Sequence, residues 1–263
     1  MTAPVLVTGG TGTLGRLLVP RLQSAGGAVR VLSRHPHDAA DGVEYAVGDL
    51  ATGEGIEAAV AGVETIVHCA GSAKGDEIKT RNLVRAARSA GATHLVYISV
   101  VGADRVPVVS GVDRAMFGYF GSKLAAERIV ADSGVPFTTL RATQFHDLVL
   151  IAAQLLVKLP VMLSFAGVRF QPIDARDVAD RLAELAAGPP AGRVADMGGP
   201  RIYPMADLLR DYLRATHRRR FILPVRQPGR AAGAYRDGAN LAPDHAVGHR
   251  TWEDFLAERV GGS

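Results

Sequence analysis

The stretch VLVTGGTGTLGRLL, residues 5–18, decides the fold. A short apolar run rich in β-branched residues stops at two glycines, and helical periodicity begins directly behind them. Gly9, Gly12 and Gly15 follow the spacing G-x-x-G-x-x-G. In such a strand–turn–helix the first glycine permits the tight turn, the second lets a pyrophosphate approach the backbone, and the third lets helix and strand pack closely. The helix amino terminus adds N–H groups and a favourable dipole. The stretch therefore predicts a dinucleotide-binding βαβ unit.

Strands and helices alternate over the first part of the chain. Apolar runs of strand length, with helical patterns between several of them, occur at VLVT, AVRVLSR, EYAVGD, TIVHCAG, HLVYISV and PFTTLRA. The rules for crossover connections then predict an α/β fold, a Rossmann-type doubly wound parallel sheet, over residues 1–145. Residues 146–263 are expected to form mainly a smaller C-terminal substrate lobe, with residues 168–190 packing back onto the core.

The pattern loosens in the second part of the chain. It predicts an apolar helix from about His146 to Leu159, a strand near RFQPI, and a helix behind Asp174 as its N-cap. A strand at FILPV, a loop at RQPGRAAG and a last helix around Trp252 follow. This lobe is expected to cover the carboxyl edge of the sheet, where ligands bind in such folds.

Composition sets broad limits on the class of protein. Of 263 residues, 48% are apolar and 21% charged, the balance of an ordinary globular chain. The one cysteine, Cys69, excludes an internal disulfide and fits a reducing cytosol. No secretion signal is visible, so a cytoplasmic location is expected. The most lipid-like segment, residues 148–165, is interrupted by Gln154, Lys158 and Pro160, and therefore no membrane span is expected.

Charge gives a weak signal about partners. The net charge is +4, and the concentrated basic run is HRRRF, residues 217–221, at the end of an expected helix. Cations there complement the helix dipole. Because no docking motif accompanies the run, no nucleic-acid partner is expected. The sequence does not decide the oligomeric state and leaves a homo-oligomer open.

The end of the second strand indicates which dinucleotide binds. Proteins that bind NAD place an acidic residue about here, on the ribose 2′-hydroxyl. This chain has Ser33 and Arg34, and no acid until Asp38. A guanidinium suits a 2′-phosphate, so NADP(H) is preferred over NAD(H) as cofactor. The alternative is that Arg34 is a solvated loop residue. His35 and His37 share the loop, but nothing else suggests a metal site, and none is predicted.

Several motifs together resemble one superfamily. TGGTGTLG, VGDL at residues 47–50, the CAG after the fourth strand and Tyr119-x-x-x-Lys123 are similar to motifs of the short-chain dehydrogenase/reductases. The form T-G-x-x-G-x-x-G resembles the extended and atypical branches. LRATQFHDL and QPIDARDVA further resemble the NmrA-like group, which includes NAD(P)H-binding quinone reductases. The resemblance covers essentially the whole chain.

The resemblance implies a set of cofactor contacts. Thr11, Thr13 and Leu14 would lie under the phosphates, Asp49 and Leu50 would flank the adenine, Ala70 and Gly71 would border the adenosine ribose, Lys123 would hold the nicotinamide ribose, and Ala142, Thr143, Gln144 and Phe145 would run past the nicotinamide.

A tyrosine and a lysine four residues apart on a helix share one face, and such a pair can do acid–base chemistry. Tyr119 would donate a proton to the nascent alkoxide, and the charge of Lys123 would lower the pKa of the phenol. By the resemblance, Ser99 would hold the substrate oxygen. Glu127, one turn further on, could pair with Lys123. Alternatively, FGYFG is an ordinary helix start.

These observations favour an NADPH-dependent oxidoreductase that reduces an apolar carbonyl or quinone by hydride transfer. Apolar walls from the helix after His146, residues 161–170, Val100 and Val101 suit such a substrate, although they could equally pack the two lobes together. In quinone reduction, solvent could supply the protons and leave Tyr119 a positioning role. A non-catalytic NADP(H)-binding redox sensor is the alternative. An epimerase or dehydratase is disfavoured, since no sugar-nucleotide handles stand out.

Overall fold

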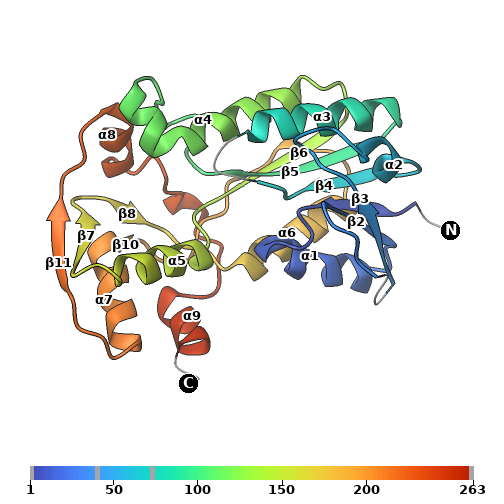
Figure 1. Ribbon diagram of the computed structural model, residues 1–263. Helices are drawn as coiled ribbons and strands as arrows, with labels where there is room; N and C mark the ends of the chain where they lie inside the picture. The colour runs from blue at the N-terminus through green and yellow to red at the C-terminus, as the bar shows by residue number, and fades with distance from the viewer. Residues whose placement is uncertain (1–2, 39–41, 72–74, 261–263) are drawn as a thin grey trace. The chain divides into compact units, whose positions relative to one another are not determined.

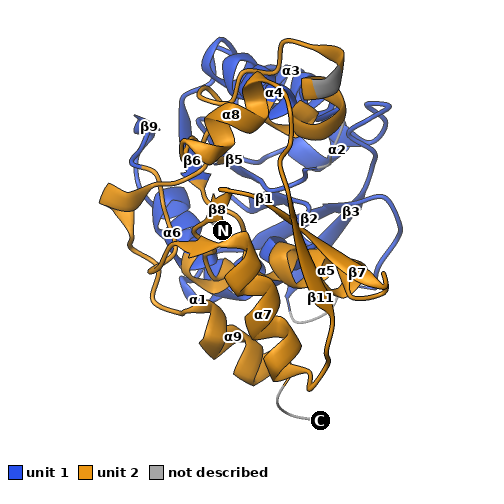
Figure 2. Cartoon of the chain, turned by 90° about the vertical axis from the view of Figure 1, so that its left-hand side faces the viewer, with its two compact units in different colours: residues 1–99, 121–141, 178–195 blue, residues 100–120, 142–177, 196–263 orange. Residues whose placement is uncertain are grey.

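The computed structural model describes residues 3–38, 42–71 and 75–260. The chain forms two compact units, coloured separately in Figure 2, and each draws on several stretches of sequence. Unit 1 comprises residues 1–99, 121–141 and 178–195. Unit 2 comprises residues 100–120, 142–177 and 196–263. Of the segment 168–190 that the sequence assigns to the core, residues 178–190 belong to unit 1 and residues 168–177 to unit 2.

A seven-stranded parallel sheet organises unit 1, and it confirms the predicted Rossmann-type fold. The strand order is β3-β2-β1-β4-β5-β6-β9. Strands β2 and β3 are added on one side of β1 and the later strands on the other, so the order of addition reverses beside β1. The glycine loop therefore follows the strand at the topological switch point, where doubly wound folds bind ligands. The strands are β1 (Val5–Thr8), β2 (Val29–Ser33), β3 (Val43–Val47), β4 (Thr65–His68), β5 (His94–Val100), β6 (Phe137–Ala142) and β9 (Gly192–Arg193).

Helices cover both faces of this sheet (Figure 1). α1 (Thr13–Ser24) and α6 (Ala175–Ala187) lie on one face, where Arg21 pairs with Asp180 at 2.5 Å. α2 (Ile56–Val60), α3 (Asp76–Ser89) and α4 (Gly111–Ala131) lie on the other. The sequence suggests FGYFG, which begins at Phe117, as the helix start, whereas α4 begins six residues earlier, at Gly111.

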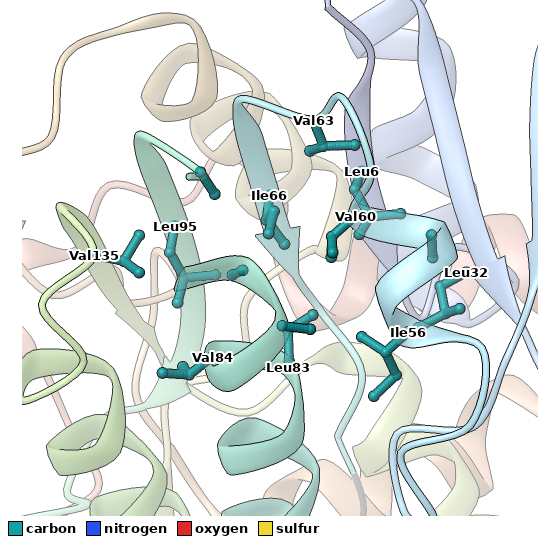
Figure 3. Packing of buried hydrophobic residues seen from close by; sticks show 14 of the residues in the cluster. Leu6, Leu32, Ile56, Val60, Val63, Ile66, Leu83, Val84, Leu95 and Val135 are labelled. Atoms are coloured by element: carbon teal, nitrogen blue, oxygen red, sulfur yellow. The ribbon is translucent and has the colours of Figure 1, made fainter. Parts of the chain in front are cut away.

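One core cluster of unit 1 lies between the sheet and the second set of helices (Figure 3). Leu6, Ile66 and Leu95 from three strands meet Leu83 of α3 and Ile56 of α2, and all five are buried almost completely. Burying each such side chain contributes roughly 1.5–3 kcal/mol. This packing explains why the strands read as nearly continuous apolar runs, since both faces of the sheet are covered.

An ion pair fastens α4 to the sheet. Arg141 of β6 donates from Nε and Nη2 to the two carboxylate oxygens of Glu127, at 2.8 and 2.6 Å. Both side chains are nearly buried. Such a bidentate pair fixes orientation as well as distance, so it sets the position of the α4 turn that carries Lys123.

Unit 2 combines helices with two small sheets. β7 (Val161–Phe165) and β11 (Phe221–Val225) pair in parallel, and β8 (Arg169–Phe170) and β10 (Tyr203–Pro204) pair antiparallel. The helices wholly in this unit are α5 (His146–Leu156), α7 (Met205–Ala215), α8 (Arg230–Arg236), a 3-10 turn (Pro243–His245) and α9 (Trp252–Arg259). In the part of the chain that the structure describes, no helix has the length and apolar character needed to cross a membrane.

The amino termini of α6 and α8 are both capped by aspartate side chains, and the sequence predicts only the first of these caps. The predicted N-cap Asp174 accepts a hydrogen bond from the N–H of Arg176 at 2.8 Å, which confirms it. The predicted loop RQPGRAAG is wrong beyond Gly229, because α8 begins at Arg230. There the carboxylate of Asp113, remote in sequence, accepts a hydrogen bond from the N–H of Ala231 at 3.2 Å. A cap supplied by another element leaves no local signal.

Replacing Arg141 with Met should lower the free energy of unfolding by about 3–5 kcal/mol, because it leaves the Glu127 carboxylate buried without its bidentate partner. Urea unfolding measures the change. The double variant Arg141→Met/Glu127→Leu should recover most of the loss. A single variant as stable as wild type would contradict this role of the pair.

Candidate functional site

Two glycines of the loop are required by backbone packing. Gly9 has φ +72°, and a Cβ there would lie 2.7 Å from the backbone nitrogen of Ala70. A Cβ at Gly15 would lie 2.2 Å from the carbonyl oxygen of Gly9. No L-residue with a side chain fits either position, so the first and third glycines serve the turn and the strand–helix contact, as predicted.

Gly12 differs from these two. It is the N-cap of α1, with φ −82°, and no side chain caps the helix. A Cβ there would meet one atom within 4 Å, the carbonyl oxygen of Gly9 at 3.3 Å. Gly12, Thr11 and Thr13 are exposed, and the first turn of α1 carries no acid. The helix therefore offers its N–H groups and dipole at an open surface, and this geometry fits the pyrophosphate of a dinucleotide.

The predicted adenosine-side residues lie at the ends of β2, β3 and β4. Ser33 is buried, and its hydroxyl accepts from the N–H of His35 at 3.2 Å and lies 3.0 Å from Nε2 of His37. Arg34 is exposed. The Asp49 carboxylate accepts from the N–H of Ala51 at 2.8 Å and so shapes its own turn. Arg34 is thus available at the end of β2, while its neighbours organise the loops.

Lys123 is the most constrained of the predicted site residues. Its Nζ lies 3.2 Å from Oδ2 of Asp76 and donates to the phenol oxygen of Tyr97 and to the carbonyl oxygen of Ile98, both at 3.3 Å. The side chains of Lys123 and Asp76 are only 4% and 1% exposed. A buried ammonium persists as a cation only with such acceptors around it.

The ion pair constrains the backbone beside it. A Cβ at Gly71 would approach Nζ of Lys123 to 3.3 Å and Oδ2 of Asp76 to 3.5 Å. The chain after β4 thus passes directly over the pair, and this places Gly71, a predicted ribose contact, next to Lys123. Because Asp76 compensates the charge of Lys123, the field that the pair exerts on other groups is that of a dipole rather than of a bare cation.

A buried network continues from the pair towards the glycine loop. The ring of Tyr97 stacks on His68, with centroids 5.4 Å apart. Nδ1 of His68 lies 2.7 Å from the hydroxyl of Thr8, and Nε2 lies 3.2 Å from that of Thr80. Burial, together with the positive charge of Lys123, lowers the pKa of His68 to about 3. His68 is therefore neutral and joins β1, β4 and α3.

Ser99 and Cys69 lie at the ends of buried strands of unit 1, but they differ in what their side chains can do chemically. Among the described residues, the buried hydroxyl of Ser99 has no hydrogen-bond partner. An unused buried hydroxyl costs about 1–3 kcal/mol, so Ser99 is a group that a ligand oxygen would satisfy. Ser99 follows Ile98, whose carbonyl accepts from Lys123. Burial raises the pKa of Cys69 to about 12, which makes it a poor nucleophile.

Residues 142–145 lie in unit 2, where they are held in place from several sides. The N–H of Thr143 donates to Met197, and its hydroxyl donates to the carbonyl of Gln171 at 2.5 Å. Nε2 of Gln144 donates to the phenol oxygen of Tyr235 at 3.3 Å, and its Oε1 has no partner among the described residues. Ala142 and Gln144 are buried, and Phe145 is half-buried.

His146 has a structural role. Its Nε2 lies 3.1 Å from the carbonyl oxygen of Arg250, and its ring stacks on Trp252 at 5.9 Å and on Phe255 at 5.1 Å. Burial lowers the pKa of His146 to about 4, against the opposing field of nearby carboxylates. A neutral histidine held in this way supports the core of unit 2.

Tyr119 lies in α4, four residues before Lys123, and is 38% exposed. Its ring packs edge-on against Phe120, 5.9 Å between centroids. Tyr119 belongs to unit 2, whereas Lys123 and Ser99 belong to unit 1. The suggested partner of Lys123, Glu127, accepts from Arg141, and the carboxylate that the structure pairs with Lys123 is Asp76. Sequence reasoning missed Asp76, which reads as an ordinary acid in the first turn of a helix.

Known proteins resemble this arrangement. A family model described as NAD(P)H-binding matches residues 9–189. The chain belongs to this family. The match covers the glycine loop, the Lys123 network and α6.

Solved structures agree with the family. The NADPH-dependent quinone oxidoreductase of Escherichia coli, complexed with NADPH, superposes with a TM-score of 0.81 at 19% identity, over 97% of this chain and 99% of that one. A short-chain dehydrogenase/reductase superfamily protein from Agrobacterium tumefaciens with bound NAD gives 0.73 at 18% identity, over 98% and 96%. These similarities show the fold, and the family match shows the NAD(P)H-binding family that the sequence resemblance implies.

A curated relative is similar in sequence as well. Quinone oxidoreductase 2 of Escherichia coli is 26% identical over 170 residues, which are 62% of this chain and 56% of the relative. The chain spans about half the length of this relative and of another curated relative that it matches.

Replacing Gly12 with Ala should leave the fold intact and weaken NADPH binding by at least about tenfold, because the new methyl group enters the phosphate cradle. Fluorescence titration with NADPH and a thermal melt measure the two effects. Gly111→Ala, at an exposed glycine whose Cβ would meet nothing within 4 Å, is the control. Unchanged affinity in Gly12→Ala would show that the phosphates lie elsewhere.

Proposed function

We propose that the protein is an NADPH-dependent reductase of apolar quinones or carbonyl compounds. The observation that carries this proposal is the open amino terminus of α1 at the switch point of the sheet, where Gly12 is exposed and no side chain caps the helix. The similarity to quinone oxidoreductases supports the class of substrate.

The choice of NADPH over NADH rests on Arg34. This guanidinium is exposed at the end of β2, and no acid stands there to take a ribose 2′-hydroxyl. A 2′-phosphate would accept charge-assisted hydrogen bonds from it.

Arg34→Ala should weaken NADPH binding roughly tenfold to a hundredfold and NADH binding by less than about twofold, because only NADPH carries the 2′-phosphate. Parallel titrations with both nucleotides measure the ratio. Arg226→Ala, at an exposed arginine of unit 2, controls for the loss of one positive charge. Equal weakening for both nucleotides would refute the assignment.

Different residues of this chain would hold the acceptor, hold the nucleotide and donate the proton. The bound dinucleotide supplies a hydride. We assign to Ser99 the role of hydrogen-bonding the acceptor oxygen, since its buried hydroxyl has no described partner. Lys123 would help to place the nicotinamide ribose beside Gly71. Tyr119 would be the proton donor to a nascent alkoxide, an assignment that rests on its spacing from Lys123 in α4.

The Lys123–Asp76 pair bears on which acceptor suits the site. A phenol with a pKa near 10 needs nearby positive charge to act as an acid–base group at neutral pH. Asp76 compensates the charge of Lys123, so the pair lowers the pKa of a phenol less than a lone ammonium would. Quinone reduction can take its protons from solvent, and it is therefore the reaction that we favour.

Tyr119→Phe should reduce ketone turnover by at least about a hundredfold, the usual contribution of a general acid, and change quinone turnover by less than about tenfold. NADPH consumption with matched panels of ketones and quinones measures both. Tyr203→Phe, on β10, is the control. Equal loss with both classes of acceptor would contradict the assignment of solvent as the proton source for quinones.

The alternative of a non-catalytic NADP(H) sensor is not favoured by the comparisons, where reductases recur. Tight NADPH binding, without oxidation of NADPH by any acceptor tested, would favour the sensor. The cytoplasmic location, the absence of a nucleic-acid partner and the open oligomeric state stay predictions from the sequence.

A further inference from the structure

Helix α5 of unit 2 carries an exposed apolar stripe. Leu148 and Leu155 are each 58% exposed, and Ile151 is 52% exposed. Their spacing of three and four residues places them on one face of the helix. Leu159, just beyond the helix, is also exposed. The opposite face carries Val149, Leu150 and Leu156, which pack on the core of unit 2.

The two-stranded sheet beside α5 also carries exposed apolar side chains. Leu163 of β7 and Leu223 of β11 are register partners, and both are exposed. Phe221, at the start of β11, is 67% exposed. β7 contacts α5, and Figure 2 shows α5, β7 and β11 side by side. We call this set the apolar face; its members are Leu148, Ile151, Leu155, Leu159, Leu163, Phe221 and Leu223.

Basic side chains border the apolar face. The run Arg218, Arg219 and Arg220 leads directly into β11, and Nε of Arg220 donates to the carbonyl oxygen of Val157 at 3.2 Å. That bond ties the run to the end of α5, next to the exposed Lys158. Arg226 follows β11 and is exposed.

Acidic side chains are absent from these segments. Residues 148–173 contain no Asp or Glu, and neither do residues 212–236, which contain seven arginines. The acid at the start of α5, Asp147, pairs with Arg259 at 3.4 Å. A second copy of the chain would bring one basic rim against another, so self-association through this face is opposed by charge repulsion.

We propose that the apolar face and its basic rim bind the surface of an anionic lipid bilayer, with the apolar side chains in the headgroup–acyl boundary and the arginines on the lipid phosphates and carboxylates. Proteins that bind anionic bilayers combine exposed leucine, isoleucine and phenylalanine with clustered lysine and arginine. The apolar face and its rim have this combination and contain no acidic residue. The protein lies on the bilayer and does not cross it. The inference holds whichever acceptor the protein reduces.

Co-sedimentation with vesicles tests the proposal. Wild type should bind vesicles of phosphatidylcholine mixed with phosphatidylserine much more tightly than vesicles of phosphatidylcholine alone, and added salt should weaken the binding. Arg218→Gln/Arg219→Gln should weaken it about 25-fold, roughly fivefold for each charge. Ile151→Gln/Leu155→Gln should weaken binding at high salt as well. Both pairs are exposed, so folding should persist.

The matched control is Arg81→Gln/Arg85→Gln, which removes two exposed arginines from α3 of unit 1 and should bind like wild type. Equal loss in the control and in Arg218→Gln/Arg219→Gln would overturn the proposal, because net charge alone would then explain it. Absence of binding, or equal binding to both kinds of vesicle, would also overturn it. So would a wild-type dimer, seen by light scattering, that Ile151→Gln/Leu155→Gln converts to monomer, since a second copy would then cover the face.

Discussion

The buried ammonium group of Lys123 determines how strand β5 and helices α3 and α4 meet in unit 1. A cation withdrawn from water needs compensation, and Asp76, Tyr97 and the carbonyl of Ile98 supply it from α3 and β5. Their convergence joins strand β5 to helices α3 and α4. The backbone after β4 also runs against the pair, since a Cβ at Gly71 would come within 3.3 Å of Nζ of Lys123.

The same compensation limits what Lys123 does chemically. A lone ammonium would acidify a neighbouring phenol, whereas a neutral pair does so more weakly. The lysine is then better suited to placing hydroxyl groups than to driving proton transfer. We therefore propose a quinone, which can take its protons from water, rather than an unactivated ketone as the acceptor.

Local sequence patterns predicted the features that local physics determines. The glycine spacing, the buried strand runs and the Asp174 cap each depend on a few adjacent residues, and the structure shows the fold that they imply.

Features that depend on tertiary contacts escaped prediction. Glu127 stands one helical turn from Lys123, yet Arg141 on β6 offers two aligned donors and holds it. Asp76 gave no signal, and α8 is capped by Asp113 from another part of unit 2. The five-residue α2 is too short for periodicity to reveal it.

The most direct test of the central claim is hydride transfer itself. NADPH deuterated separately at each of the two C4 positions of the nicotinamide would be incubated with the protein and a quinone, and the deuterium left in the oxidised nucleotide would be measured. The account predicts loss of label from one position and retention at the other, because a nucleotide held at the α1 cradle and beside Gly71 presents one face. Loss from both positions alike, or NADPH that binds tightly and is never oxidised by any quinone, would contradict it.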